Sequence, residues 1–153
     1  MNLHIYLGLL HRGEQTLASS FRQVSEGHGD EPDIHFLCQS LGGQSEHHVA
    51  LLLPVVERYG EEGSDNEPER LHAQGLSETR SGPVGLLRDL QDLYVLASLV
   101  DITWTVMEQA GQALRDSELL SVVEQCHQET EVQLRWLKTR IKQAAPQALL
   151  VAE

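Results

Sequence analysis

The chain has 153 residues, with 23 Asp and Glu against 11 Lys and Arg, and a formal net charge of -12 with histidines neutral. This length predicts one domain whose core needs neither disulfide nor metal, and the acidity excludes nucleic acids and anionic membranes as partners, because both require clustered basic side chains. The composition also includes 8 histidines, an unusual number beside so few strong bases.

The N-terminal segment lacks the features of a secretion signal, since no basic residue precedes its apolar stretch and no small-residue cleavage site follows it. The longest apolar runs, such as residues 49–56, are far too short to span a bilayer. We therefore expect a cytoplasmic protein in which Cys38 and Cys126 are reduced thiols, buried as small hydrophobic side chains.

Apolar residues recur every three or four positions over residues 3–27 and again over residues 33–59, which predicts two amphipathic helices. The glycines and proline of residues 27–32 suit the end of one helix and the first turn of the next. Pro54 lies inside the second pattern. Because it removes a backbone hydrogen bond, we expect it to kink this helix or to end it early.

Residues 60–83 are acidic and rich in Gly, Ser and Pro, and they are longer than an ordinary loop in a compact domain. Beyond them, the same helical spacing of apolar residues covers residues 84–114 and residues 118–144. Pro146 follows the last of these patterns and is expected to end the fourth helix.

Connection lengths decide the arrangement of these helices. The first and third connections are short, so each joins an antiparallel helical hairpin. A helix of about 25 to 30 residues is roughly 40 Å long, and residues 60–83 can cover that distance when extended. We therefore predict a single all-α domain over residues 1–153, an antiparallel four-helix bundle of two hairpins joined by a long crossover.

This connectivity is shared by ferritin-like proteins, and the fourth helix adds Glu124-x-x-His127 and Trp136-Leu137 followed by basic residues. The chain resembles the ferritin-like, rubrerythrin-type superfamily of di-iron carboxylate proteins over nearly its whole length as architecture. The resemblance implies metal at mid-bundle, held by one carboxylate from each of two helices and a Glu-x-x-His pair from each of the others. It also implies iron or manganese in redox, oxygen or peroxide handling.

Placed on this chain by height in the bundle and by helix face, the family pattern falls on Glu14, His48, Asp101, Glu124 and His127. Two positions depart from that pattern. Ser45 stands where a glutamate would precede His48, and Asp101 is one methylene shorter than the expected glutamate. A serine hydroxyl is a poor ligand for iron or manganese, so we expect an incomplete centre, either mononuclear or degenerate.

Neighbouring polar residues are weaker candidates. Gln44 faces inward beside His48, whereas Glu46, His47 and Glu131 are close in height but lie on less suitable helix faces. The remaining histidines fall at helix ends, on outer faces or in the crossover, and we predict them at the surface: His4, His11, His28, His35 and His72.

Two functions of different classes follow. The first is a ferritin-like metal-binding protein with iron or manganese at the five residues named above. The alternative is a metal-free helical bundle that serves as a structural or protein-interaction module, as the missing carboxylate at Ser45 suggests. Whether the chain is an enzyme stays open, because a fold alone does not define a reaction. The resemblance also implies a homo-oligomer, a dimer or larger.

Overall fold

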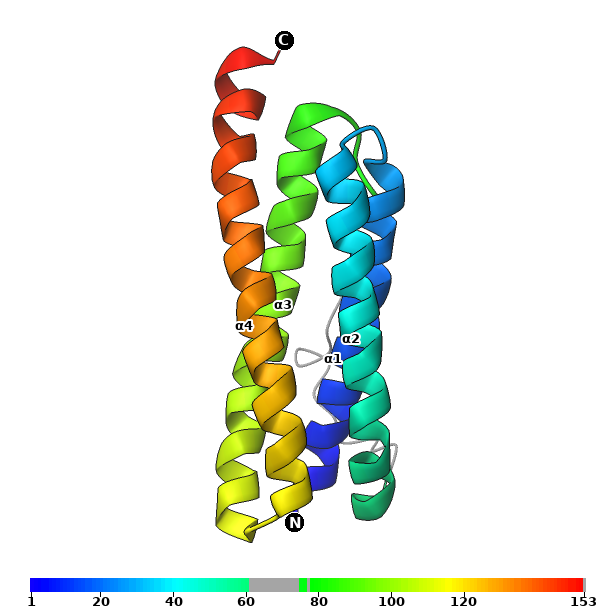
Figure 1. Cartoon of the computed structure of the whole chain (residues 1–153), viewed down its shortest axis with the longest axis vertical. Coiled ribbons are helices and arrows are strands. Elements are labelled where there is room, and N and C mark those ends of the chain that lie inside the picture. Colours follow the sequence, from blue (N-terminus) through cyan, green and yellow to red (C-terminus); the bar gives the residue numbers. More distant parts are fainter. Residues whose placement is uncertain (61–74, 77, 153) are drawn as a thin grey trace.

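The computed structural model describes residues 1–60, 75–76 and 78–152, and four long helices dominate it (Figure 1). They end close to the predicted residues, and a short π-helix, η2, continues the fourth. The bounds are Leu3–Gly27 for α1, Pro32–Tyr59 for α2, Gly82–Leu114 for α3, Ser117–Pro146 for α4 and Gln147–Val151 for η2. None of the helices in these ranges is long and apolar enough to cross a membrane.

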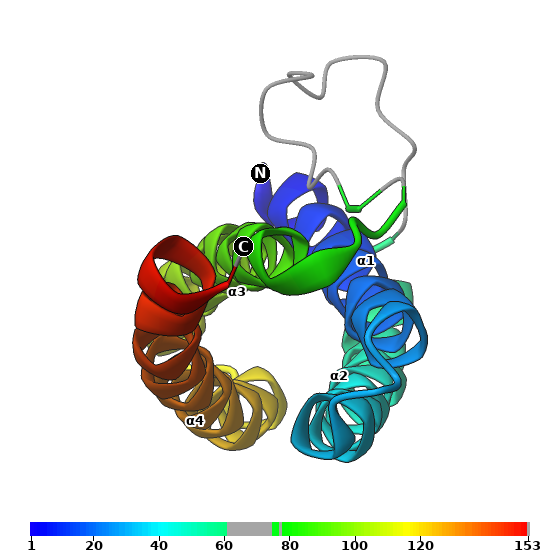
Figure 2. The ribbon, with the colours of Figure 1, turned by 90° about the horizontal axis from the view of Figure 1, so that it is seen from above.

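The helices form the predicted two hairpins. In Figure 1, α1 rises, α2 and α3 both descend, and α4 rises again, so α2 and α3 are parallel. Seen from above, α1 lies beside α2 and α3, and α4 lies on the other side of α3 (Figure 2). The all-α bundle of two antiparallel hairpins is therefore confirmed. Because α2 and α3 run in the same direction, the chain between them must cross the length of the bundle.

Most of the predicted crossover, residues 61–74 and residue 77, lies outside the described residues. Its last part lies along α1, where the backbone nitrogen of Leu76 donates to Ser20 Oγ at 3.3 Å. At Gly75, a Cβ atom would lie 2.7 Å from Thr16 Cγ2, closer than such atoms approach. Glycine at this position therefore allows the chain to lie directly on α1.

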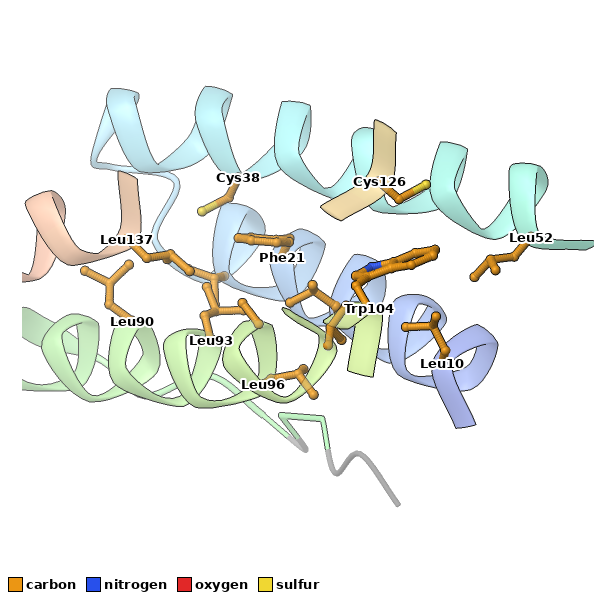
Figure 3. Packing of buried hydrophobic residues seen from close by; sticks show 14 of the residues in the cluster. Leu10, Phe21, Cys38, Leu52, Leu90, Leu93, Leu96, Trp104, Cys126 and Leu137 are labelled. Atoms are coloured by element: carbon orange, nitrogen blue, oxygen red, sulfur yellow. The ribbon is translucent and has the colours of Figure 1, made fainter. Parts of the chain in front are cut away.

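The core consists of apolar side chains from all four helices (Figure 3). Its largest members include Phe21 of α1, Leu52 of α2, Trp104 of α3 and Leu137 of α4, all with no exposed surface. Full burial of one such side chain stabilises the fold by about 1.5–3 kcal/mol. The helical spacing of apolar residues in the sequence thus becomes one continuous core between the helices.

Both cysteines are buried in this core, as predicted. Burial raises the pKa of the Cys38 thiol to about 12 and also raises the pKa of the Cys126 thiol. Because the thiolate is the reactive form, neither cysteine is suited to act as a nucleophile in the folded chain.

The two prolines at or inside the helices differ in effect. Helix α2 continues past Pro54 to Tyr59, so this proline does not end it early. The α-helix α4 ends at Pro146, as predicted, but the chain continues as the π-helix η2. Both prolines are on exposed faces. The carbonyl four residues earlier, which loses its N–H partner, can therefore bind water instead.

Two histidines predicted at the surface are buried, namely His11 and His28, which are 7% and 4% exposed. His28 Nε2 lies 2.8 Å from Oδ2 of Asp89, a fully buried carboxylate of α3. Asp89 also accepts from the backbone nitrogen of Arg80 at 2.9 Å and from its Nη1 at 2.8 Å. These contacts tie the end of α1 to the start of α3. His72 lies outside the described residues.

Asp89 and Asp92 provide a matched test, because both accept from Arg80 Nη1 at 2.8 Å but only Asp89 is fully buried. We expect Asp89→Ala to lower the free energy of unfolding by about 3–5 kcal/mol, since it removes one partner of a buried charged network. Asp92→Ala should cost less than about 1 kcal/mol, as for exposed ion pairs. Urea unfolding followed by circular dichroism measures both losses, and equal losses would contradict the assigned role of Asp89.

Candidate metal centre

Glu14 of α1 and His48 of α2 meet inside the bundle, where neither side chain has exposed surface. Each belongs to the inward face of its helix, because buried leucines lie three or four residues away along the chain. His48 Nδ1 donates to Glu14 Oε2 at 3.0 Å, and Trp104 Nε1 donates to Glu14 Oε1 at 3.2 Å. Both carboxylate oxygens therefore have partners, which removes the penalty of burying a bare carboxylate.

The other ring nitrogen of His48 faces α4. Nε2 lies 3.5 Å from Glu129 Oε2 and has no hydrogen-bond partner among the described residues. Burial opposes protonation of this imidazole, but the hydrogen bond to Glu14 and the charges of Glu14 and Glu129 outweigh it. The net effect raises the pKa of His48 above its ordinary value. The group made by Glu14, His48, Trp104 and Glu129 is called the inner cluster below.

Ser45, one turn before His48, faces a second polar residue of α4. Gln133 Nε2 donates to Ser45 Oγ at 3.2 Å and to Gln44 Oε1 at 2.9 Å. Ser45 and Gln133 are both fully buried. The position where the family pattern places a carboxylate is therefore filled by a hydroxyl and an amide that bond to each other.

Asp101 of α3 and His127 of α4 meet on the opposite flank of α4, together with Glu131. His127 Nε2 lies 3.1 Å from Asp101 Oδ1 and 3.7 Å from Glu131 Oε1. One ligand atom from each of these three residues falls within 4.8 Å of the other two, and no other His, Cys, Asp or Glu trio in the described ranges meets this criterion. These three residues are called the outer cluster below.

Asp101 Oδ1 is buried, yet it has no hydrogen-bond partner among the described residues, although His127 Nε2 is close. On the far side of the imidazole, Nδ1 lies 3.9 Å from Glu108 Oε2. His127 thus has carboxylates facing both of its ring nitrogens. A cation shared by Nε2 and Oδ1 would give the buried oxygen the partner it lacks.

The outer cluster borders a surface groove of about 390 Å³ between α3 and α4. The groove is lined by three carboxylates and one histidine, with no Lys or Arg, so it favours cations. Glu124, a predicted ligand, is exposed and lines this groove one turn before His127. The lining residues are Glu108, Leu120, Val123, Glu124, His127, Gln128 and Glu131.

The five residues predicted as one metal site thus lie in three places: two in the inner cluster, two in the outer cluster and one at the edge of the groove. Glu14 and His48 belong to the inner cluster, Asp101 and His127 belong to the outer cluster, and Glu124 stands at the edge of the groove. The division follows from α4, because positions 127 and 129 differ by about 200° around a helix. His127 therefore faces α3 while Glu129 faces α2.

Sequence reasoning missed Glu129 and ranked Glu131 below Glu124. The signal for Glu131 was its position four residues after His127, which places the two side chains about 40° apart on one helix face. Nothing in the spacing of Glu129 singled it out, because its partner His48 lies on another helix.

The chain was compared with family models, with curated proteins and with solved structures, and none of these comparisons found a match. The function is therefore inferred from the chemistry and geometry of this chain's own residues.

The raised pKa of His48 predicts a pH dependence of stability. A protonated His48 stabilises the folded chain fully below its ordinary pKa of about 6.5, and this contribution is lost as the pH rises through the higher folded-state pKa. We expect His48→Gln to lower the free energy of unfolding by about 1–3 kcal/mol at low pH and to remove this decline. Urea unfolding at a series of pH values, from below 6.5 to above the folded-state pKa of His48, measures this free energy for both chains.

The exposed neighbour His47 provides the control, because it is on the same helix but outside the inner cluster. His47→Gln should keep both the stability and the pH dependence of the original chain. The assignment fails if His48→Gln and the original chain lose stability in parallel as the pH rises.

Proposed function

We propose that this chain binds one divalent transition-metal ion, iron or manganese, in the groove between α3 and α4. The ligands would be His127, Asp101 and Glu131. The observation that carries this proposal is the convergence of these three ligand atoms around a buried carboxylate oxygen that has no hydrogen-bond partner.

The distances support this ligand set. Two ligand atoms that share a first-row ion at about 2.1 Å lie roughly 3–3.5 Å apart. His127 Nε2 is 3.1 Å from Asp101 Oδ1 and 3.7 Å from Glu131 Oε1, so a small movement of the exposed Glu131 side chain would complete the contact. One imidazole with two carboxylates is a donor set that suits Fe²⁺ and Mn²⁺.

Two further carboxylates support the three ligands. With Nε2 bound to the ion, His127 would carry its proton on Nδ1, which faces Glu108. Such a carboxylate orients the ring and increases its basicity. Glu124 lies on the groove rim, where its charge attracts cations without direct ligation.

The two-hairpin connectivity of the bundle supports a ferritin-like relationship. In this chain the proposed ion would lie on the α3–α4 flank and not in the middle of the bundle.

The inner cluster is a weaker candidate for an ion, because Glu14 already accepts from His48 and Trp104. An iron or manganese ion in the outer cluster would supply one-electron redox chemistry next to solvent. The protein would provide the ligands and restrict them to one face of the ion.

The second candidate is a metal-free helical bundle that acts as a structural or interaction module. The observation in its favour is that Ser45 and Gln133 bond to each other where a ligand would be expected. In that case, the outer cluster would be a polar network of one histidine and two carboxylates.

Metal loading separates the two candidates. The chain, prepared without a histidine tag, is incubated anaerobically with Fe²⁺ or Mn²⁺, dialysed and measured for metal by mass spectrometry. We expect one ion per chain, and a loss of at least tenfold in affinity for Asp101→Asn and for His127→Ala, because each removes a direct ligand. His47→Ala, which removes an exposed histidine outside the cluster, should leave the ratio at one.

A ratio near zero for the original chain would favour the metal-free bundle. An ion that survives His127→Ala but is lost in His48→Gln would place the metal in the inner cluster and overturn the proposed site.

A further inference from the structure

The outer face of α3 exposes an apolar stripe, which is unexpected in a chain with a net charge of -12. Val95 is 69% exposed, Ile102 is 56% exposed and Val106 is 42% exposed, while Leu99 between them is half-buried. The stripe lies opposite the side of α3 that contributes Trp104 to the core. In Figure 2, α3 turns one side away from the other helices.

The spacing of the stripe is that of a helix–helix seam. Its residues, Val95, Leu99, Ile102 and Val106, are separated by steps of four, three and four. These are successive a and d positions of a heptad, which in coiled coils face a second helix. The inward face of α3 already packs in the core, so this second seam is extra to the needs of the bundle.

The flanks of the stripe are suited to burial. Between residues 93 and 107, Asp101 is the only Asp, Glu, Lys or Arg, and its carboxylate faces His127 of α4. The flanking hydroxyls already have acceptors within α3: Ser98 donates to the carbonyl of Tyr94 and Thr103 donates to that of Leu99, both at 2.7 Å. Covering this face would therefore leave few polar groups without partners.

The stripe is also self-complementary, because steps of four, three and four read the same in both directions. A two-fold axis between Leu99 and Ile102 would place Val95 against Val106 of the partner subunit. The same axis would place Leu99 against Ile102 of the partner subunit. Such an isologous arrangement is the commonest interface in homo-oligomers.

Charge at the ends of the stripe selects the antiparallel direction. The next seam positions are Asp92 on one side and Gln109 on the other. In an antiparallel pair, Asp92 and the Arg80 side chain that it binds meet the neutral Gln109 of the partner subunit, whereas a parallel pair would bring two Asp92–Arg80 ion pairs together. Each charged group would then lie beside its own copy, and like charges at such close positions are destabilising.

We propose that the outer face of α3 is a homodimer interface, in which two copies of the chain pack α3 against α3 in antiparallel direction through the stripe. An apolar hollow of about 40 Å³ between α1 and α3, lined in part by Tyr6, Leu99 and Thr103, adjoins the seam and receives part of the second copy. The interface is independent of the metal proposal, because Asp101 faces away from it toward α4.

Sedimentation equilibrium of the full chain over a range of concentrations tests the interface. We expect a mass twice the 17.1 kDa of one chain, and a single-chain mass for Ile102→Glu, which places two carboxylates beside the axis. Val132→Glu is the control, because Val132 is a similarly exposed valine on α4, and it should remain dimeric. Unchanged helicity by circular dichroism shows that both variants fold.

Cross-linking tests the direction. Val95→Cys and Val106→Cys chains, mixed and oxidised mildly, should form a disulfide-linked heterodimer, and neither variant alone should cross-link through its new cysteine. Cys38 and Cys126 are buried and do not interfere. The proposal is overturned by a monomeric original chain, by an Ile102→Glu variant that stays dimeric, or by cross-linking of Val95→Cys alone.

Discussion

A carboxylate with no exposed surface, that of Glu14, is the constraint on which the middle of this bundle depends. A bare buried carboxylate would cost several kcal/mol, so α2 and α3 must bring donors to it. They do so with His48 Nδ1 and Trp104 Nε1, one for each carboxylate oxygen. These two hydrogen bonds set the register of α1 against both of its neighbours, since sliding either helix by one turn would leave one oxygen of Glu14 without a partner.

The same constraint decides what α4 contributes. His48 presents its remaining nitrogen to Glu129, and Ser45 is already engaged by Gln133. Because one side of α4 packs against α2, His127 faces α3. There it lies close to Asp101 of α3 and to Glu131 of its own helix. The inner polar residues thus hydrogen-bond mainly to each other, although His48 Nε2 and Gln133 Oε1 have no partner among the described residues. On the α3–α4 flank, the buried Oδ1 of Asp101 also lacks a hydrogen bond.

The sequence predicts the helices and their directions well, because both follow from the spacing of apolar residues and from loop lengths. It leaves the effect of Pro54 open between a kink and an early end, and α2 continues past this proline because solvent can replace the hydrogen bond that it removes from an exposed turn. It fails at His28, because its partner Asp89 lies far along the chain and no local pattern links the two residues.

For the candidate site, helix geometry correctly brings Glu14 to His48 and Asp101 to His127, but it merges the two pairs into one site. A rotation of about 100° per residue shows on which side of the helix a residue lies, but not how far its side-chain atoms extend toward a neighbour. It places Glu124 and Glu131 at similar angles around the helix, about one turn before and one turn after His127. The choice between them depends on side-chain rotamers, and only Glu131 brings its oxygen close to Nε2.

The proposed function requires that His127, and not His48, is the histidine that binds the metal ion. Electron spin-echo modulation of the Mn²⁺-loaded chain reports directly bound imidazole nitrogen. We predict the signature of one histidine, retained in His48→Gln and lost in His127→Ala. A nitrogen signal that disappears in His48→Gln and persists in His127→Ala would contradict it.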